Sequence, residues 1–247
     1  MKKYKLQFNK KYGQNFLTDE QVLDDIISTS GITPDDGALE IGPGLGTLTF
    51  ALAQAAKHVV AVEIDRGLAA VLEDTLAEFD TVTVLHQDIL KTDIGALVAQ
   101  QFDGRAPYVV ANLPYYITSP ILTALLEAEC FRSVTVMVQK EVAQRICSPA
   151  GKGDYGAFSV FCQYYAEPEL LFDVPASCFI PQPKVTSAVL KLTMRKESVC
   201  EIKSEAMFFK VVRAAFAQRR KTLLNALSSG LSQFDKPALA AVIEDCG

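Results

Sequence analysis

Short apolar runs rich in valine and isoleucine alternate with longer amphipathic stretches between residues 37 and 139. Runs of this length and composition are typical of strands buried on both faces, whereas the longer stretches have the spacing of helices. The predicted strands cover residues 37–41, 58–63, 81–87, 108–111 and 133–139, and the predicted helices lie near 47–56, 66–78, 93–101 and 119–129. Strands that alternate with helices predict an α/β fold with a parallel sheet and right-handed crossovers.

The pattern changes after residue 139. A helix is predicted over residues 140–147 and an alternating strand over residues 185–194. From residue 205 onward the spacing is helical, and one face of the first helix carries large apolar side chains: Phe209, Val212 and Phe216. We therefore predict two domains, a sheet domain over residues 1–198 and a small helical domain over residues 199–247.

The composition is that of a folded protein, because 49% of the 247 residues are hydrophobic, enough for one large domain and a smaller appendage. The lysine-rich start has no apolar stretch after it, and no apolar run approaches the roughly 20 residues that span a bilayer. The six cysteines include no Cys-x-x-Cys pair and there are two histidines, which disfavours a zinc site and favours a reducing compartment. We expect a cytoplasmic protein with no membrane partner and no metal.

Basic side chains gather in two parts of an otherwise acidic chain whose net charge is −5. Residues 1–11 hold five lysines and no acid, and residues 184–221 hold ten basic and three acidic side chains. This segregation predicts a local phosphate-binding surface, although such cations can also be merely solvated. The cations that we expect to contact a polyanion are Lys10, Lys11, Lys184, Arg219, Arg220 and Lys221.

The segment Asn112-Leu113-Pro114-Tyr115 directly follows the predicted strand 108–111. Thr118 or Ser119 can cap a helix behind it, with a proline in the first turn. The segment therefore lies on a strand-to-helix loop, where open α/β sheets bind their ligands.

The side chains of this loop suit an adenine amine. Such an amine is a poor nucleophile because its nitrogen lone pair is delocalised into the ring, and hydrogen bonds to both N–H groups favour a pyramidal nitrogen. The Asn112 side-chain oxygen and a backbone carbonyl of Leu113 or Pro114 can accept those bonds, while Tyr115 can stack on the base. The alternative is a proline turn with tyrosines that pack in the core.

A glycine-rich turn, residues 40–46, joins the first predicted strand to the first helix. Gly42 and Gly44 allow a close backbone approach to a ligand, which can be a dinucleotide, an S-adenosyl group or nothing. Glu63 ends the second strand, where it can accept both hydroxyls of a ribose, and Asp88 ends the third. A sulfonium suits a loop among carboxylates better than a pyrophosphate does, which favours S-adenosylmethionine over NAD.

Motifs along most of the chain resemble those of one family. They are Gly13-Gln14-Asn15-Phe16-Leu17, the turn 40–46, Glu63-Ile64-Asp65, Gln87-Asp88-Ile89, the segment 112–117, Phe179 to Val185 and Phe216 to Lys221. Their order, from about residue 5 to residue 228, is that of the ribosomal RNA adenine N6-dimethyltransferases, and closely that of the small-subunit dimethyladenosine transferases of the KsgA type. The resemblance implies a Rossmann-like class I S-adenosylmethionine methyltransferase sheet with a small C-terminal helical domain.

The resemblance also implies roles for individual residues. The positions expected to contact S-adenosyl-L-methionine are Asn15, Leu17, Gly42, Gly44, Glu63, Asp88 and Asn112. Tyr115 and Phe179 are the aromatic residues expected to sandwich the target adenine, and a plain core position is the alternative for Phe179. The implied reaction is N6,N6-dimethylation of two adjacent adenosines in the 3'-terminal hairpin loop of small-subunit (16S) rRNA. The implied partner is a 30S-type ribosomal particle, and the protein is expected to act as a monomer in small-subunit biogenesis.

Leu113 and Tyr116 favour the small-subunit type over the resistance methyltransferases that act on large-subunit RNA. The alternatives are a large-subunit rRNA adenine methyltransferase, a non-catalytic RNA-binding assembly factor and, from a different class, an NAD-dependent dehydrogenase. Members of the family usually continue with more helix after the segment that corresponds to 235–246. We therefore expect a truncated form in which the methyl-transfer site is intact.

Overall fold

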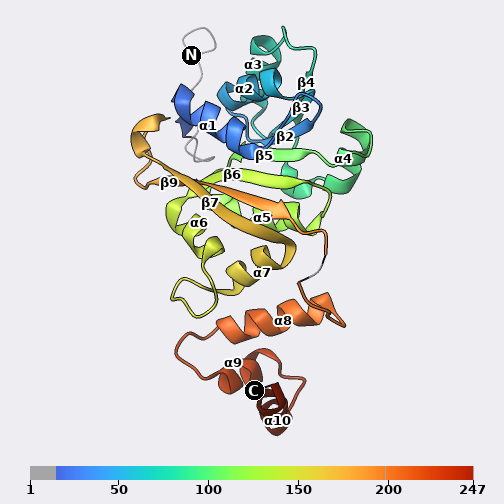
Figure 1. Ribbon diagram of the computed structural model, residues 1–247, viewed down its shortest axis with the longest axis vertical. Coiled ribbons are helices and arrows are strands. Elements are labelled where there is room, and N and C mark those ends of the chain that lie inside the picture. The colour runs from blue at the N-terminus through green and yellow to red at the C-terminus, as the bar shows by residue number, and fades with distance from the viewer. Residues whose placement is uncertain (1–14, 198, 247) are drawn as a thin grey trace.

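A seven-stranded sheet forms the centre of the computed structural model, which describes residues 15–197 and 199–246 (Figure 1). Across the sheet the strands follow the order β4 (Val82–His86), β3 (His58–Glu63), β2 (Gly37–Ile41), β5 (Tyr108–Asn112), β6 (Ser133–Gln139), β9 (Ser187–Met194) and β7 (Ala166–Val174). The five strands from β4 to β6 are parallel, and β9 is antiparallel to both of its neighbours. The strand order reverses between β2 and β5, so the carboxyl ends of these strands border a natural ligand crevice.

The predicted strands agree closely with the observed ones. Those predicted over 37–41, 58–63 and 133–139 have the observed bounds, and those over 81–87 and 108–111 differ by one residue at one or both ends. The apolar runs lack a polar alternation because helices cover both faces of the parallel strands. The parallel part of the predicted sheet is therefore confirmed.

Two groups of helices bury the two faces. α1 (Glu20–Ser30) and α2 (Thr47–Ala55) contribute to the core on one face. The helices that contribute to the core on the other face are α4 (Ile94–Gln101), α5 (Thr118–Glu127), α6 (Lys140–Cys147) and α7 (Ala157–Tyr165). α3 (Arg66–Thr75) packs against β3 and β4. Sequence reasoning missed α1, whose start is capped by an Asp19 oxygen that accepts from the Val22 N–H at 3.2 Å.

A second sheet, of two strands, joins a segment near the start of the described chain to a segment just before β9. β1 (Phe16–Leu17) pairs antiparallel with β8 (Phe179–Ile180), so that Leu17 lies opposite Phe179. The Leu17 carbonyl also accepts from the Thr47 hydroxyl at 3.0 Å, which ties β1 to the start of α2. Neither strand has a visible period in the sequence, because each spans only two residues.

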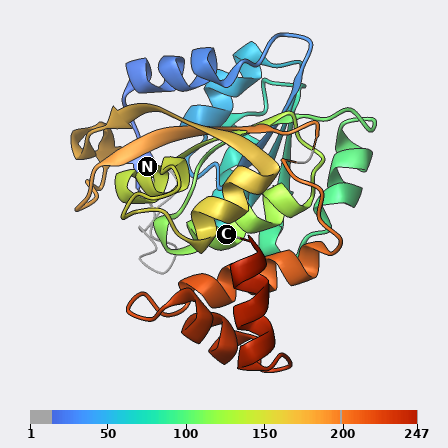
Figure 2. The same cartoon turned by 60° about the horizontal axis from the view of Figure 1, so that its bottom comes forward.

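Three C-terminal helices lie beyond the sheet domain (Figure 2): α8 (Glu205–Phe216), α9 (Leu223–Gly230) and α10 (Lys236–Cys246). They share a small core of their own, formed by Ala214, Leu227, Leu231 and Leu239. Phe209 of α8 packs instead on α7, where its ring centroid lies 5.2 Å from that of Phe161. The predicted division between residues 198 and 199 stays a prediction.

One detail of the predicted α8 face is wrong. Phe209 and Val212 are buried as expected, but the Phe216 side chain is 39% exposed and meets the Tyr155 ring edge-on at 5.9 Å. Phe216 is the last residue of α8, where the helical spacing no longer guarantees that a neighbouring element covers the side chain.

None of the helices in the described part of the chain is long and apolar enough to cross a membrane. All six cysteines are free. Within residues 15–197 and 199–246, no group of three or more His, Cys, Asp or Glu side chains is arranged to hold a metal ion.

Candidate active site

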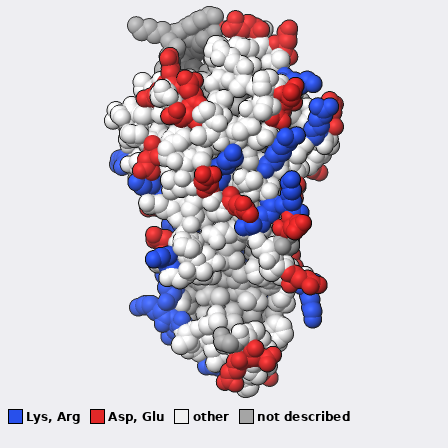
Figure 3. All heavy atoms as spheres, in the orientation of Figure 1, with Lys and Arg blue, Asp and Glu red and all other residues white. Residues whose placement is uncertain are grey.

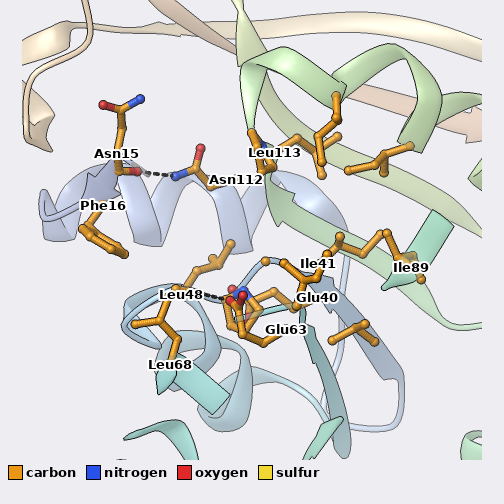
Figure 4. A pocket seen from close by; sticks show the side chains of 18 of the residues that line it. Asn15, Phe16, Glu40, Ile41, Leu48, Glu63, Leu68, Ile89, Asn112 and Leu113 are labelled. Carbon is orange, nitrogen blue, oxygen red and sulfur yellow. Dashed lines mark hydrogen bonds between the residues drawn. The ribbon is translucent and has the colours of Figure 1, made fainter. Parts of the chain in front are cut away.

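Most of the predicted site residues line one pocket at the carboxyl ends of β2, β3 and β5 (Figure 4). The predicted residues in its wall are Asn15, Leu17, Gly42, Gly44, Glu63, Asp88, Asn112, Leu113, Pro114 and Tyr115. Parallel strands bring these distant segments together because their carboxyl ends meet at one edge of the sheet. The glycine turn and the Asn-Leu-Pro-Tyr segment are therefore parts of the same site.

The glycine turn forms one wall of the pocket. Gly42 and Gly44 have φ angles of +68° and +61°, in the left-handed region that glycine adopts without strain. A Cβ atom on Gly44 would lie 2.9 Å from the ring of Phe16, which is closer than side chains pack. The Gly44 N–H also donates to Glu63 Oε2 at 3.2 Å, so the turn holds the carboxylate at the end of β3.

Glu63 is buried and its carboxylate is held by the backbone. Oε1 accepts from the Asp65 N–H at 2.8 Å, and Oε2 accepts from Gly44. Burial raises the pKa of Glu63, and these two backbone N–H groups partly offset the rise. Each oxygen keeps a further lone pair, so the group can accept hydrogen bonds from the two hydroxyls of a ribose, and that contact stays a prediction.

Asp88 borders the pocket after β4 and starts a short 3-10 helix. Its Oδ1 accepts from the Leu90 N–H at 3.1 Å, and its Oδ2 lies 3.5 Å from the Lys91 ammonium. These contacts orient the carboxylate at the third strand end, where the sequence predicts a contact with the cofactor.

Asn112 at the end of β5 is oriented by a long-range hydrogen bond. Its side-chain Nδ2 donates to the backbone carbonyl of Asn15 at 3.0 Å (Figure 4). Because a carbonyl only accepts, this contact decides which end of the amide is the nitrogen. The Asn112 Oδ1 atom is then directed away from Asn15 and can accept from an amine in the pocket.

The next two residues, Leu113 and Pro114, each offer a backbone carbonyl, and the Pro114 carbonyl is already hydrogen-bonded. Leu113 is buried, and its N–H donates to the Met137 carbonyl at 3.1 Å. The Pro114 carbonyl accepts from the Ile117 N–H at 3.2 Å and from the Thr118 hydroxyl at 3.1 Å. Because the Pro114 oxygen already has two donors, the Leu113 carbonyl is the better second acceptor for an amine.

The predicted helix cap behind this segment is wrong. A 3-10 turn over Tyr115–Ile117 follows Pro114, and α5 starts at Thr118 with Ile117 in the cap position. Neither Thr118 nor Ser119 caps the helix, because Thr118 turns its hydroxyl back to the Pro114 carbonyl. The 3-10 turn makes the loop tighter than the sequence suggests.

Tyr115 is held by a residue that sequence reasoning missed. Its phenol is hydrogen-bonded to the Ser187 hydroxyl, at the fully buried start of β9. Burial raises the pKa of Tyr115, and the Ser187 contact partly offsets the rise. With the phenol bound to β9, the pocket is left with the ring of Tyr115 for stacking. Ser187 lies in the predicted strand 185–194, but it shares its side of the alternation with the polar Lys191 and Thr193, so the sequence gives no clear signal for this contact.

Phe179 does not line the pocket. Its side chain is 1% exposed and belongs to the core on the α1 and α2 face, with Leu17, Met137 and Val189 among its cluster. The core alternative therefore describes Phe179 in this structure, and its stacking on adenine stays a prediction that requires the ring to move. Tyr116, to which sequence reasoning gave no contact role, is 57% exposed in the pocket wall.

The predicted RNA-contacting cations lie outside the pocket. Lys184 is exposed in the loop between β8 and β9, and Arg219 to Lys221 are exposed in the loop between α8 and α9. Basic side chains gather where this second loop lies, at the lower left of Figure 3. Lys10 and Lys11 fall outside the described residues.

The chemistry of the wall suits S-adenosylmethionine. The described residues that line the pocket include the carboxyl groups of Glu40, Glu63 and Asp88 but no lysine or arginine. A pyrophosphate would face carboxyl groups and no cation in this wall, whereas a sulfonium and an ammonium are attracted to carboxylates. The apolar remainder, which includes Ile41 and Ile89, suits a purine ring.

A protein-family model described as ribosomal RNA adenine dimethylase matches residues 5–243. The chain belongs to this family. Among curated relatives of the dimethylase, the ribosomal RNA small subunit methyltransferase A of Alkaliphilus metalliredigens is 49% identical over 99% of this chain and 85% of its own length. The protein of the same name from Lachnoclostridium phytofermentans is 48% identical over 100% of this chain and 86% of its own length.

Solved structures agree with the assignment of this chain to the dimethylase family. A dimethyladenosine transferase from Plasmodium falciparum has a TM-score of 0.74 at 27% identity and covers 88% of this chain and 77% of its own. The 23S rRNA methyltransferase ErmE has a TM-score of 0.71 at 29% identity and covers 93% of this chain and 89% of its own. The predicted family, the class I methyltransferase fold, the enzymatic nature and the cofactor S-adenosyl-L-methionine are confirmed.

Proposed function

We propose that this dimethylase converts two adjacent adenosines in the 3'-terminal hairpin loop of small-subunit rRNA to N6,N6-dimethyladenosine. Its partner is a 30S-type ribosomal particle in the cytoplasm, on which the protein acts as a monomer in small-subunit biogenesis. The observation that carries the proposal is the orientation of the Asn112 side-chain amide. Its nitrogen donates to the Asn15 carbonyl, which leaves the amide oxygen available to a ligand in the pocket, beside the Leu113 carbonyl. The small-subunit names of the relatives support the choice of RNA.

The two oxygens act on the target amine. When an adenine enters the pocket, Asn112 Oδ1 and the Leu113 carbonyl accept its two N–H groups and free the nitrogen lone pair. S-adenosyl-L-methionine, when bound, supplies an electrophilic methyl group on sulfur. Holding the nitrogen at about 3–3.5 Å in line with that methyl group removes most of the orientational entropy from the barrier.

Tyr115 supplies a rigid platform for the base. Extracting an adenine from its stack costs a few kcal/mol and costs least in a loop, which favours a hairpin substrate. Stacking on a ring that Ser187 already holds in place recovers roughly 1–3 kcal/mol of that cost. Tyr116 and, after a movement, Phe179 can complete the aromatic wall.

No side chain needs to act as a general base. Methylation makes the amine nitrogen acidic, so that its proton can leave to water. This agrees with the positions of the histidines, because His86 bonds to the Ile64 carbonyl at 3.1 Å and His58 packs against the Phe102 ring. Neither histidine is in the described wall of the pocket.

The loop between α8 and α9 supports the RNA part of the proposal. In Figures 1 and 2 this loop lies on the same side of the molecule as the β8–β9 end of the sheet domain. Lys184 and the cations of residues 219–221 are therefore on one flank, where they can contact phosphates on either side of a base in the pocket.

The test is methyl transfer with tritium-labelled cofactor to small-subunit particles that lack these methyl groups, followed by nucleoside analysis. We expect about four methyl groups per particle, all in N6,N6-dimethyladenosine, and none in large-subunit particles handled in the same way. Label confined to large-subunit RNA would support the large-subunit alternative. Tight particle binding without any transfer would support the non-catalytic assembly factor and overturn the proposal.

A further inference from the structure

Phe216, the last residue of α8, is a large apolar residue that the proposed mechanism leaves without a task. It is 39% exposed, and its ring meets that of Tyr155 edge-on, with the ring centroids 5.9 Å apart and the ring planes at 69°. An edge-on contact covers at most one face of either ring. Phe216 and Tyr155 therefore form an aromatic pair in which at least one face of the Phe216 ring is left for another partner.

The aromatic pair lies where two loops meet. Tyr155 belongs to the loop between α6 and α7, residues 148–156, and Phe216 leads directly into the loop between α8 and α9, residues 217–222. Both loops lie on the same side of the molecule in Figures 1 and 2. The surface that they form thus combines one aromatic ring from the sheet domain with one from the C-terminal helices.

Three adjacent cations follow the aromatic pair along the chain. Arg219, Arg220 and Lys221 are exposed, and no ion pair between described residues involves any of them. The loop between α6 and α7 adds Lys152 and Asp154, whose charges offset each other. Basic side chains gather on this side of the molecule in Figure 3. A polyanion is therefore attracted to the surface on which the aromatic pair lies.

Contacts of α8 with α7 hold the aromatic pair in place on the sheet domain. Phe209 of α8 packs on Phe161 of α7, with the ring centroids 5.2 Å apart. One turn earlier on α8, a Glu205 carboxylate oxygen accepts from the hydroxyl of Tyr165, the last residue of α7. Because these contacts fix α8 before a ligand arrives, little conformational entropy is lost when the ligand binds at its end.

We infer that an unpaired base of the RNA stacks on Phe216, outside the methyl-transfer pocket, while the cations of residues 219–221 contact the adjoining phosphates. The inference rests on the proposed function, in which ribosomal RNA is the polyanion. Aromatic rings that stack on bases beside cations that follow the backbone are the common means of holding a single strand. A base within a duplex has no free face, so this contact selects an unpaired nucleotide.

Tryptophan fluorescence tests the stacking directly, because the natural chain contains no tryptophan. Phe216→Trp places a single indole in the aromatic pair, and stacking on a base quenches indole fluorescence. The variant is titrated with a single-stranded oligoadenylate of about ten nucleotides and with an abasic strand of the same length. We expect the oligoadenylate to quench the fluorescence and the abasic strand, which brings the same phosphates without bases, to leave it nearly unchanged.

Phe234→Trp is the matched control, since Phe234 is 45% exposed on the same helical unit, in the loop between α9 and α10. Its fluorescence should not respond to the oligoadenylate. Equal quenching of the two variants, or equal quenching by the two strands, would overturn the inference. A fluorescence shift of Phe216→Trp that depends on protein concentration and not on RNA would assign the ring to a second copy of the chain and would overturn it as well.

Binding to small-subunit particles provides the second measurement, and it decides the question if Phe216→Trp does not fold. Phe216→Ala should weaken particle binding by roughly 5- to 100-fold with cofactor affinity unchanged, and Phe234→Ala should alter neither. Phe216→Leu can still pack on Tyr155 but has no ring, so it should lose as much as the alanine variant. Full affinity for Phe216→Leu would show that the side chain acts through packing and would overturn the inference.

The outcomes separate this inference from the proposed function. Quenching by oligoadenylate in a protein that methylates no small-subunit particle would support the stacking contact and count against the proposed function. Methylation of the particle by the unaltered protein, together with unquenched Phe216→Trp and full affinity for Phe216→Ala, would overturn the stacking contact alone.

Discussion

The pocket and the basic loop between α8 and α9 differ in how each polar group is held. In the pocket, Glu63 is buried and Asn112 is partly buried, and each makes a hydrogen bond to a backbone group of a distant segment. In the loop, Arg219 and its neighbours are exposed at the surface of a small helical unit. Interactions in the pocket are therefore strong and depend on geometry, whereas those of the loop are screened by salt and depend on the number of charges.

This difference separates two tasks of the dimethylase. Transfer of a methyl group needs atoms held within a fraction of an ångström, which only a packed sheet edge supplies. Attraction of a polyanion needs cations in the right region, and a loop on one flank can supply them. Single substitutions should therefore act sharply on the pocket and gradually on the loop.

The largest effect is expected for Asn112→Ala. It removes one of the two acceptors for the amine, which should lower kcat by roughly 10²–10³. The cofactor dissociation constant should change by less than about tenfold, because the lost contact to Asn15 is one neutral hydrogen bond. Single-turnover methylation and calorimetry measure the two quantities.

Asn225→Ala is the control for this variant, since Asn225 on α9 bonds to Lys236 at 2.8 Å in the C-terminal unit. Its turnover on a small-subunit particle should stay near that of the unaltered protein. If Asn112→Ala also kept the turnover of the unaltered protein, the proposed role of the amide would be refuted. The pocket and the loop would then not differ in their sensitivity to substitution.

Alanine variants of two glycines test whether the pocket is as closely packed as the comparison with the basic loop implies. Gly44 and Gly151 both have positive φ angles, +61° and +85°, so alanine should destabilise either position by about 1–2 kcal/mol. A Cβ on Gly44 meets the Phe16 ring at 2.9 Å, whereas a Cβ on Gly151 meets nothing within 4 Å. We expect only Gly44→Ala to weaken cofactor binding, by roughly tenfold or more. Calorimetry and thermal unfolding of both variants provide the check, and equal losses of cofactor affinity would show that strain alone is responsible.

The loop is tested by changing Arg219, Arg220 and Lys221 to alanine together. If three phosphate contacts are lost, the slope of log affinity for RNA against log salt should fall by roughly two, with cofactor binding unchanged. Replacing three other exposed lysines, Lys57, Lys196 and Lys203, controls for net charge. The same fall in slope for both triple variants would mean that the charge acts through the whole protein and not through the loop.

The smallest effect is expected at the contact between Tyr115 and Ser187. Tyr115→Phe and Ser187→Ala each remove the hydrogen bond that holds the ring and should lower kcat by roughly two- to tenfold. The double variant should lose no more than either single one, because the two side chains act through one contact. Tyr115→Ala, which removes the ring, should lose more. Additive losses in the double variant would show that the two residues act independently.

The sequence alone determined the strands and the place of the site. Buried parallel strands appear as apolar, β-branched runs, so β2, β3 and β6 were predicted to their exact bounds. The polar residues that follow these runs, such as Glu63 and Asn112, had to meet at one edge because parallel strands share their direction. Both inferences depend only on neighbouring residues and on a general rule of topology.

Only the tertiary structure decided which partners those residues meet. The pairing of Leu17 with Phe179, which places Phe179 in the core, joins two-residue strands that have no period to recognise. The Tyr115 contact with Ser187 and the Asn112 contact with Asn15 also depend on how distant segments pack. Local patterns specify backbone conformation, whereas hydrogen bonds between segments far apart in the chain, and the charge states that follow from burial, exist only once the sheet has assembled.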